Sequence, residues 1–131
     1  GVMSFLIQKW LLLCVLMSLS MQSVLVVGKT QVIIVNALVP VGNLDLTIHC
    51  KSGDDDLGIQ LLHHSDSFSW EFKPNIFGTT QYYCSFQWNG ETHWFDIYKY
   101  KRDKDICQHC LWFINKSGPT RDNSEHFPWN N

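Results

Sequence analysis

The segment YYCSFQWNG, residues 82–90, carries the pattern that decides the fold. Its apolar side chains occupy every second position from residue 82 to residue 88, and a period of two is typical of a β-strand with one buried face. Asn89-Gly90 follows at once, and this dipeptide is a strong signal for the two-residue turn of a β-hairpin. The segment therefore predicts a strand, a tight turn and a second strand that runs antiparallel to the first.

The same alternation recurs in short runs beyond residue 28, and turn-forming residues separate these runs. No stretch there keeps a helical period of apolar residues. Short strands with one apolar face each indicate an all-β fold, a small antiparallel β-sandwich of about seven to eight strands. The spacing of an immunoglobulin domain is not met, because Cys84 follows Trp70 too closely. The other runs cover residues 32–35, 44–50, 57–61, 68–72, 95–97 and 112–114.

Length and composition limit the classes of protein to be considered. The chain has 131 residues, enough for one domain with one core, and its hydrophobic content of 45% is too high for a disordered protein. The formal net charge is -2, which gives no electrostatic argument for binding nucleic acid. No run of basic residues along the sequence points to a membrane surface either.

Residues 1–28 differ in composition from the rest of the chain. One positive charge, Lys9, precedes an apolar run over residues 10–17, and small residues follow. This order predicts a secretory signal peptide that is cleaved between residues 20 and 28. The alternative is an uncleaved membrane anchor, but residues 10–27 are marginal in length for spanning a bilayer and contain several serines. Cleavage would leave residues 29–131, a β-sandwich domain with a short polar C-terminal tail and no stable membrane insertion.

Four cysteines lie beyond the predicted signal peptide: Cys50, Cys84, Cys107 and Cys110. An even number in a short secreted chain predicts two disulfides, and three pairings are possible. The C-x-x-C spacing of the last two also fits a zinc site, but the secretory route favours disulfides.

The acidic segment HCKSGDDDLG, residues 49–58, suggests three interpretations: a metal site, an acid–base site or a solvated turn. It lacks the ligand spacing of an EF-hand loop, and no glutamate follows nearby. Adjacent aspartates between two strands are typical of a turn, because Asp side chains bond their own backbone. A structural turn is the first interpretation, and a receptor contact is the second, since loops on a rigid scaffold often carry binding residues.

No catalytic, cofactor or metal site is predicted. His63 and His64 are adjacent, so on a strand they point to opposite faces, and the other histidines are scattered. No nucleophile elbow, no cysteine–histidine pair with an orienting group and no glycine-rich phosphate loop is present in the sequence. The chain is therefore predicted not to be an enzyme.

An aromatic strip is a possible feature of the region around residue 97. Trp94, Tyr98 and Tyr100 have the opposite parity to Phe95 and Ile97. The three rings form either a second buried face or an exposed strip for a sugar or a protein partner. Burial or a protein interface is the preferred interpretation.

The sequence contains one glycosylation sequon, Asn115-Lys116-Ser117. With Trp112 and Ile114 inward, Asn115 is expected to point outward, close to the Gly118-Pro119 turn. Exposure and a secretory route together predict N-glycosylation at Asn115, and the alternative is an unused sequon.

Several motifs taken together resemble those of the plant self-incompatibility S-protein homologues. The resemblance covers about residues 30–118, and the combination of HCKS-DDDLG with the late C-x-x-C-x-W is specific. Gly53 stands where members often carry a charged residue. The resemblance implies a small secreted β-sandwich with two disulfides and a ligand role in cell-to-cell recognition. The motifs are V-x-I-x-N at 32–36, HCKSGDDDLG at 49–58, W-x-F at 70–72, Phe77-Gly78, Tyr83-Cys84 with Trp88, FDIYKYKRD at 95–103 and C-x-x-C-x-W at 107–112.

The functional hypothesis is a secreted, monomeric, non-enzymatic ligand that a cell-surface protein receptor recognises. The alternatives are a secreted carbohydrate- or membrane-binding defence protein that uses the aromatic strip, and a secreted hydrolase or metal-dependent enzyme. Core side chains such as Leu46, Trp70, Phe86 and Trp112 are expected to matter for folding, and the turns for recognition. The candidate receptor-contact residues are Gly53, Asp54, Asp55, Asp56, His63, His64, Ser65, Asp66, Asn89, Gly90 and Glu91.

Overall fold

A computed structural model describes residues 3–4, 6–11, 28–40, 44–122 and 124–130. Most of the predicted signal peptide lies outside these residues, and its cleavage stays a prediction. Residues 6–11 are helical, and no helix within the described residues is long and apolar enough to span a membrane.

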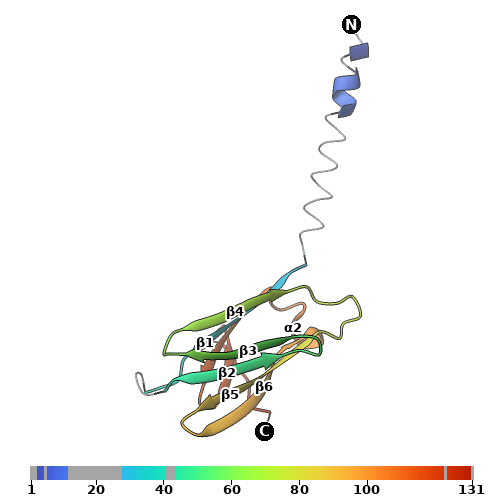
Figure 1. The fold of residues 1–131 in the computed structure, drawn as a ribbon. Coiled ribbons are helices and arrows are strands. Elements are labelled where there is room, and N and C mark those ends of the chain that lie inside the picture. The colour runs from blue at the N-terminus through green and yellow to red at the C-terminus, as the bar shows by residue number, and fades with distance from the viewer. Residues whose placement is uncertain (1–2, 5, 12–27, 41–43, 123, 131) are drawn as a thin grey trace.

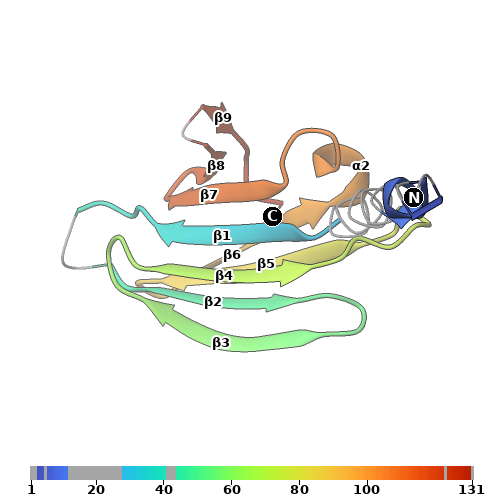
Figure 2. The same ribbon diagram turned by 90° about the horizontal axis from the view of Figure 1, so that it is seen from above.

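From residue 30 onward the chain forms two packed β-sheets, which confirms the predicted β-sandwich (Figures 1 and 2). The described residues hold nine strands, slightly more than predicted, and β9 has only two residues. One sheet contains, in spatial order, β4 (Ser67–Phe72), β1 (Thr30–Asn36), β7 (His109–Asn115), β8 (Gly118–Arg121) and β9 (Glu125–His126). The other contains β3 (Asp56–Leu62), β2 (Leu46–Lys51), β5 (Gln81–Trp88) and β6 (Glu91–Lys99).

Two details differ from the predicted antiparallel sandwich without helix. β1 and β7 run parallel to each other, whereas the other strand pairs are antiparallel. A hairpin forces neighbouring strands to run antiparallel, but β1 and β7 are joined only through the rest of the domain, so no turn fixes their direction. One helical turn, α2 (Tyr100–Asp103), links β6 to the segment before β7.

The core lies between the two sheets, where the apolar residues of the alternating runs meet. Leu46, Phe86 and Trp112 were predicted to be core residues, and all three are completely buried. Trp70 is only partly buried, but its ring packs 5.4 Å from the ring of Tyr82. Full burial of each such side chain stabilises the fold by roughly 1.5–3 kcal/mol, which makes this layer the main source of stability.

The alternation over residues 57–61 predicted that the apolar side chains of β3 point into the core, and this prediction is wrong. Ile59 and Leu61 are 68% and 57% exposed, and Leu62 is buried instead. The pairing of β3 with β2 shifts register by a β-bulge next to Gly58, which has a φ of 77°. An extra residue reverses the facing of every side chain that follows it, so the simple alternation fails here.

The C-terminal tail, predicted to be short and polar, is instead folded onto the sandwich. It contributes β9, and the rings of Phe127 and Trp129 pack against the core cluster. Trp129 lies 5.2 Å from the ring of Phe86, and its indole N–H donates to the carbonyl of Lys116 at 2.9 Å. A Cβ at Gly118 would lie 2.0 Å from the Phe127 carbonyl oxygen, so only glycine permits this approach.

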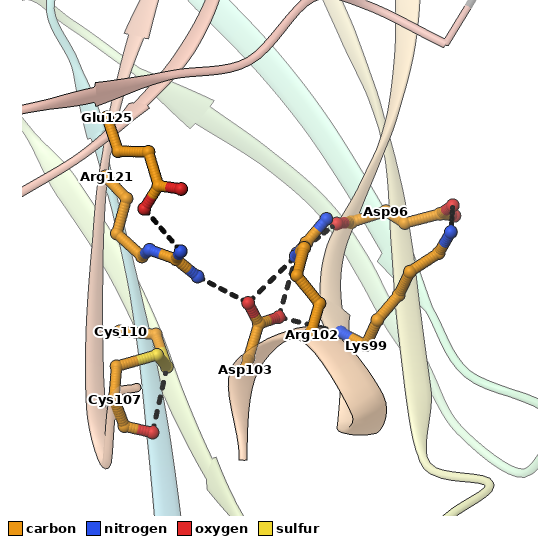
Figure 3. A network of polar contacts seen from close by, with 8 residues as sticks. All are labelled: Asp96, Lys99, Arg102, Asp103, Cys107, Cys110, Arg121 and Glu125. Atoms are coloured by element: carbon orange, nitrogen blue, oxygen red, sulfur yellow. Dashed lines mark hydrogen bonds and ion pairs between the residues drawn. A yellow bond between two sulfur atoms is a disulfide. The ribbon is translucent and has the colours of Figure 1, made fainter. Parts of the chain in front are cut away.

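The two predicted disulfides are confirmed, and the structure gives their pairing. Cys50 and Cys84 lie opposite each other on β2 and β5, and they form what we call the inter-strand disulfide. Cys107 and Cys110 are joined across a three-residue separation, and they form the loop disulfide. The first holds the centre of one sheet, and the second fixes the entry of the chain into β7 (Figure 3).

Candidate functional site

The candidate receptor-contact loops lie at opposite ends of the sandwich, so they do not form one surface. The acidic turn between β2 and β3 lies at the same end as the β4–β5 loop and α2 (Figure 2). The turn between β3 and β4, with His63 to Asp66, and the turn with Asn89 and Gly90 lie at the opposite end. A partner that binds one end leaves the other end free.

Within the acidic turn, the three aspartates have different surroundings. Ser52 Oγ accepts a bond from the Asp55 N–H at 3.1 Å, and the Ser52 N–H donates to the Asp55 carbonyl at 2.8 Å. Asp56 accepts a bond from the Gly58 N–H at 2.9 Å and lies 2.6 Å from His49 Nε2. The Gly58 N–H and His49 hold the pKa of Asp56 below its ordinary value, so it remains charged.

Asp56 is thus used to fasten the turn to the sheet, as the structural interpretation of the acidic segment predicted. Asp54 and Asp55 are exposed, and their carboxylates make no hydrogen bond or ion pair within the part of the chain that the structure describes. The turn therefore displays two negative charges on a fixed backbone.

These two aspartates line a groove of roughly 840 Å³ between the acidic turn and the β4–β5 loop. Glu71 and Lys73, at the end of β4, line it as well. Burial raises the pKa of Tyr82, and the negative charges of Asp55 and Asp54 add to this shift, so its hydroxyl stays protonated. The groove offers a partner three carboxylates, one ammonium group and the phenols of Tyr82 and Tyr83.

The opposite end is organised by Asn36, which is completely buried. Its amide nitrogen donates to the carbonyls of Leu44 and Leu62 at 3.0 and 2.9 Å, and its Oδ1 accepts from the Leu38 N–H. These bonds join the ends of β1 and β3 to the segment before β2. The Asn of the V-x-I-x-N motif is therefore a structural hub.

The turn between β3 and β4 rests on this hub, and each of its polar residues has a partner. The Ser65 N–H donates to the Asn36 carbonyl at 2.9 Å, and His64 Nδ1 donates to the Leu38 carbonyl at 3.0 Å. His63 Nδ1 lies 2.9 Å from Asp45 Oδ1. That hydrogen bond and the charge of Asp45 raise the pKa of His63.

The predicted hairpin at Asn89-Gly90 is confirmed. Trp88 pairs with Glu91, so the turn has two residues, with φ of 48° at Asn89 and 80° at Gly90. Two positive φ angles define the turn type that asparagine and glycine favour. Both residues and Glu91 are exposed, and they form a second, smaller display surface.

The aromatic strip does not exist as a continuous surface. Tyr98 is completely buried, while Trp94 is 47% exposed. Tyr100 belongs to α2 and packs against the backbone of Gly78. A register shift between β5 and β6 turns Tyr98 inward, which is the buried alternative for that residue.

At the sequon, the amide nitrogen of Asn115 is already engaged. It donates to Thr120 Oγ1 at 3.0 Å and to the Phe113 carbonyl at 3.3 Å, and the residue is partly buried. Attachment of a glycan requires that same nitrogen. Glycosylation of Asn115 stays a prediction.

A buried ionic network is the polar cluster that the sequence reasoning missed (Figure 3). Asp103 is completely buried and binds Arg102 and Arg121, while Arg121 also binds Glu125. The Lys99 N–H donates to Asp103 Oδ2 at 2.8 Å. The sequence signal that could have revealed this network is the pair of basic residues before Asp103 at the end of the FDIYKYKRD motif.

The network has a structural role, because the partners of Asp103 come from several elements. Arg102 lies on α2, Arg121 on β8, and the Lys99 N–H ends β6. Both guanidinium groups lie over aromatic rings, with Arg102 Cζ 5.1 Å from the Phe95 ring centre and Arg121 Cζ 5.4 Å from that of Trp112. In the described part of the chain, no group of three His, Cys, Asp or Glu side chains is placed to hold a metal ion.

Comparison with known proteins gives consistent matches. The family model described as plant self-incompatibility protein S1 matches residues 31–130. From Arabidopsis thaliana, S-protein homolog 29 is 42% identical over 109 residues, 79% of each chain, and S-protein homolog 2 is 44% identical over 123 residues, 85% of this chain and 74% of that one. S-protein homolog 5 is 43% identical over 91 residues, 68% of this chain and 71% of that one.

A solved structure shares the fold. It is a self-incompatibility protein homologue, described as one of a widespread family of small, highly stable, secreted proteins from plants. It matches with a TM-score of 0.57 at 18% identity, and the match covers 79% of this chain and 96% of that one. At this identity the likeness concerns the β-sandwich alone.

Proposed function

Because the chain belongs to the plant self-incompatibility protein S1 family, we propose that it is a secreted, non-enzymatic ligand that a cell-surface protein receptor recognises. Export of the chain is supported by the predicted signal peptide and by the two disulfides, which are typical of an oxidising compartment. The Asp103 network is buried and tied to the fold. The surface features that remain are display loops on a rigid frame, as a ligand requires.

The acidic turn is the observation that carries this proposal. Asp54 and Asp55 are exposed, while Ser52 and Asp56 hold the turn, and the inter-strand disulfide lies just before it at Cys50. A loop that is already fixed loses little conformational entropy on binding. Two carboxylates in a groove attract a positively charged segment of the receptor and speed its association.

The test measures binding of the labelled secreted protein to intact cells of the tissue that responds to it. Asp54→Asn with Asp55→Asn should weaken binding by about tenfold and lower its dependence on salt. The control is Glu91→Gln at the opposite end, which removes an exposed carboxylate and should leave binding unchanged.

Two results decide between the parts of this proposal. Cell binding that is unchanged in amount and affinity after complete proteolytic removal of cell-surface proteins would exclude a protein receptor. If instead Glu91→Gln or His63→Gln weakens binding while the double variant does not, the receptor contacts the opposite end of the sandwich.

A further inference from the structure

The β4–β5 loop carries the most exposed large apolar side chains in the described part of the molecule. Ile76 and Phe77 are adjacent, and they are 89% and 83% exposed. Single exposed apolar residues are common, but two neighbours at the tip of one loop form a protruding apolar point. Within the described residues, nothing in the fold covers them.

The backbone of this loop is held firmly. Asn75 Oδ1 accepts a bond from the Thr79 N–H at 3.0 Å, and its amide nitrogen donates to Thr79 Oγ1 at 2.7 Å. The Asn75 N–H donates to Thr80 Oγ1 at 2.8 Å. Gly78 has a φ of 69°, and its Cα faces the Tyr100 ring so closely that a Cβ would lie 2.8 Å from it. The two apolar side chains therefore protrude from a preformed loop rather than a flexible one.

Beside the tip lies a pocket of roughly 390 Å³ with three lysines in its wall: Lys29, Lys73 and Lys104. Ile76 and Tyr100 line the same pocket, and no carboxylate is among the described residues that line it. Lys104 Nζ lies 5.0 Å from the centre of the Tyr100 ring, and its hydrogen bond with the Tyr100 hydroxyl raises its pKa. Three lysines thus line one pocket beside an apolar surface.

We propose that this end of the sandwich docks on an anionic phospholipid bilayer. The lysine pocket binds lipid phosphate groups, and Ile76 and Phe77 enter the boundary between head groups and acyl chains. Apolar burial combined with attraction between lysines and anionic lipids is the general basis of reversible membrane binding. The pocket shares Lys73 with the groove beside the acidic turn, but Ile76, Lys29 and Lys104 do not line that groove. The proposal does not depend on a receptor.

Charge also sets the orientation of the docked molecule. Asp54, Asp55 and Glu71 line the groove on the other side of the same loop, where they repel anionic lipid. The molecule must therefore tilt so that the lysine pocket approaches the bilayer and the acidic groove faces away. A protein partner with an apolar recess is the competing occupant, but the surface that meets the lysine side must be negatively charged, as anionic lipid is.

The experiment is sedimentation with vesicles of phosphatidylcholine alone and with added phosphatidylserine, using the chain recovered from the medium of secreting cells. We expect binding to the mixed vesicles that weakens as salt rises. Ile76→Ser with Phe77→Ser should weaken it at least tenfold. Lys73→Gln with Lys104→Gln should weaken it about 25-fold, since each lysine near an anionic surface contributes about fivefold.

Matched controls distinguish binding through this site from nonspecific adsorption to vesicles. Ile59→Ser with Leu61→Ser removes a similar exposed apolar pair from β3, and Lys116→Gln removes an exposed charge at the opposite end; neither should change vesicle binding. Asp54→Asn with Asp55→Asn should strengthen vesicle binding, the opposite of its expected effect on the receptor. All changed residues are exposed, and thermal unfolding confirms that each variant folds.

The proposal is overturned if the chain ignores phosphatidylserine or fails to bind mixed vesicles at low salt. Unchanged binding by the Ile76 and Phe77 variant, or an equal loss in the Ile59 and Leu61 control, would also overturn it. If the loop binds a protein and the chain does not bind vesicles, the surface belongs to a protein partner and the proposal is overturned.

Discussion

Replacing Asp103 by alanine is expected to lower the free energy of unfolding by about 3–5 kcal/mol, because the change leaves a buried arginine without its counter-charge. Asp103 is 0% exposed and Arg121 only 2% exposed. Neither group is reached by water in the folded protein, so water cannot replace the lost partner.

The contacts of Asp103 rank how much each partner contributes to the expected loss of stability. Arg121 dominates, because its remaining partner is Glu125, which is 54% exposed and compensates only partly. The Lys99 N–H also loses its acceptor, but this bond is only partly buried, so water can replace part of it and the added cost is smaller. Arg102 matters less, because it is 22% exposed and keeps its bond to the Asp96 carbonyl.

The assay is equilibrium unfolding in urea. The free energies of unfolding are compared between variants whose dependence on urea concentration is the same. Glu125→Ala is the control, and it should cost under about 1 kcal/mol because that carboxylate is exposed. Asp103→Leu combined with Arg121→Met should recover most of the loss, since a buried pair replaced by apolar groups is often neutral. A loss below about 1 kcal/mol for Asp103→Ala, or a double variant less stable than the single one, would refute the reasoning.

Three further predictions concern stability. Removing the inter-strand disulfide should cost about 4 kcal/mol and removing the loop disulfide about 2 kcal/mol in urea unfolding, because the sequence separations are 34 and 3. The folded-state pKa of His63 is raised, so its ion pair with Asp45 stabilises the fold below the ordinary histidine pKa, and this gain disappears as pH rises through the folded value. An NMR titration should show the raised pKa, and Asp45→Asn should remove most of the shift. Gly58→Ala should cost about 1–2 kcal/mol through its φ of 77° alone, because nothing lies within 4 Å of the added methyl group, whereas Gly53→Ala should be nearly neutral.

The strands and one hairpin could be predicted because their patterns are local. The alternation from residue 82 to residue 88 places Cys84, Phe86 and Trp88 inward in the structure, as expected. Asn89-Gly90 needs two positive φ angles, and few other dipeptides adopt them at low cost. The parallel pairing of β1 with β7 has no local signature, since it depends on how the whole chain returns.

The facing of side chains inferred from the alternation was wrong where a β-bulge interrupts a strand. Gly58 between Leu57 and Ile59 was the available signal, because an isolated glycine inside a strand pattern often marks a bulge. No comparable signal precedes Tyr98, where the register shift between β5 and β6 turns two successive residues, Ile97 and Tyr98, inward. One bulge exposed an aliphatic pair, and the other divided the expected aromatic strip.

The three lysines that line one pocket could not be expected from the net charge or from basic runs in the sequence. A formal charge of -2 and the lack of a basic run gave no reason to expect a membrane surface. Lys29, Lys73 and Lys104 are far apart in the chain, yet the ends of β1 and β4 and the turn after α2 bring them to one pocket. The aspartates that balance them are gathered across the same loop. An electrostatic surface is determined by the distribution of charge in space, and a nearly neutral total is compatible with two strong local fields of opposite sign.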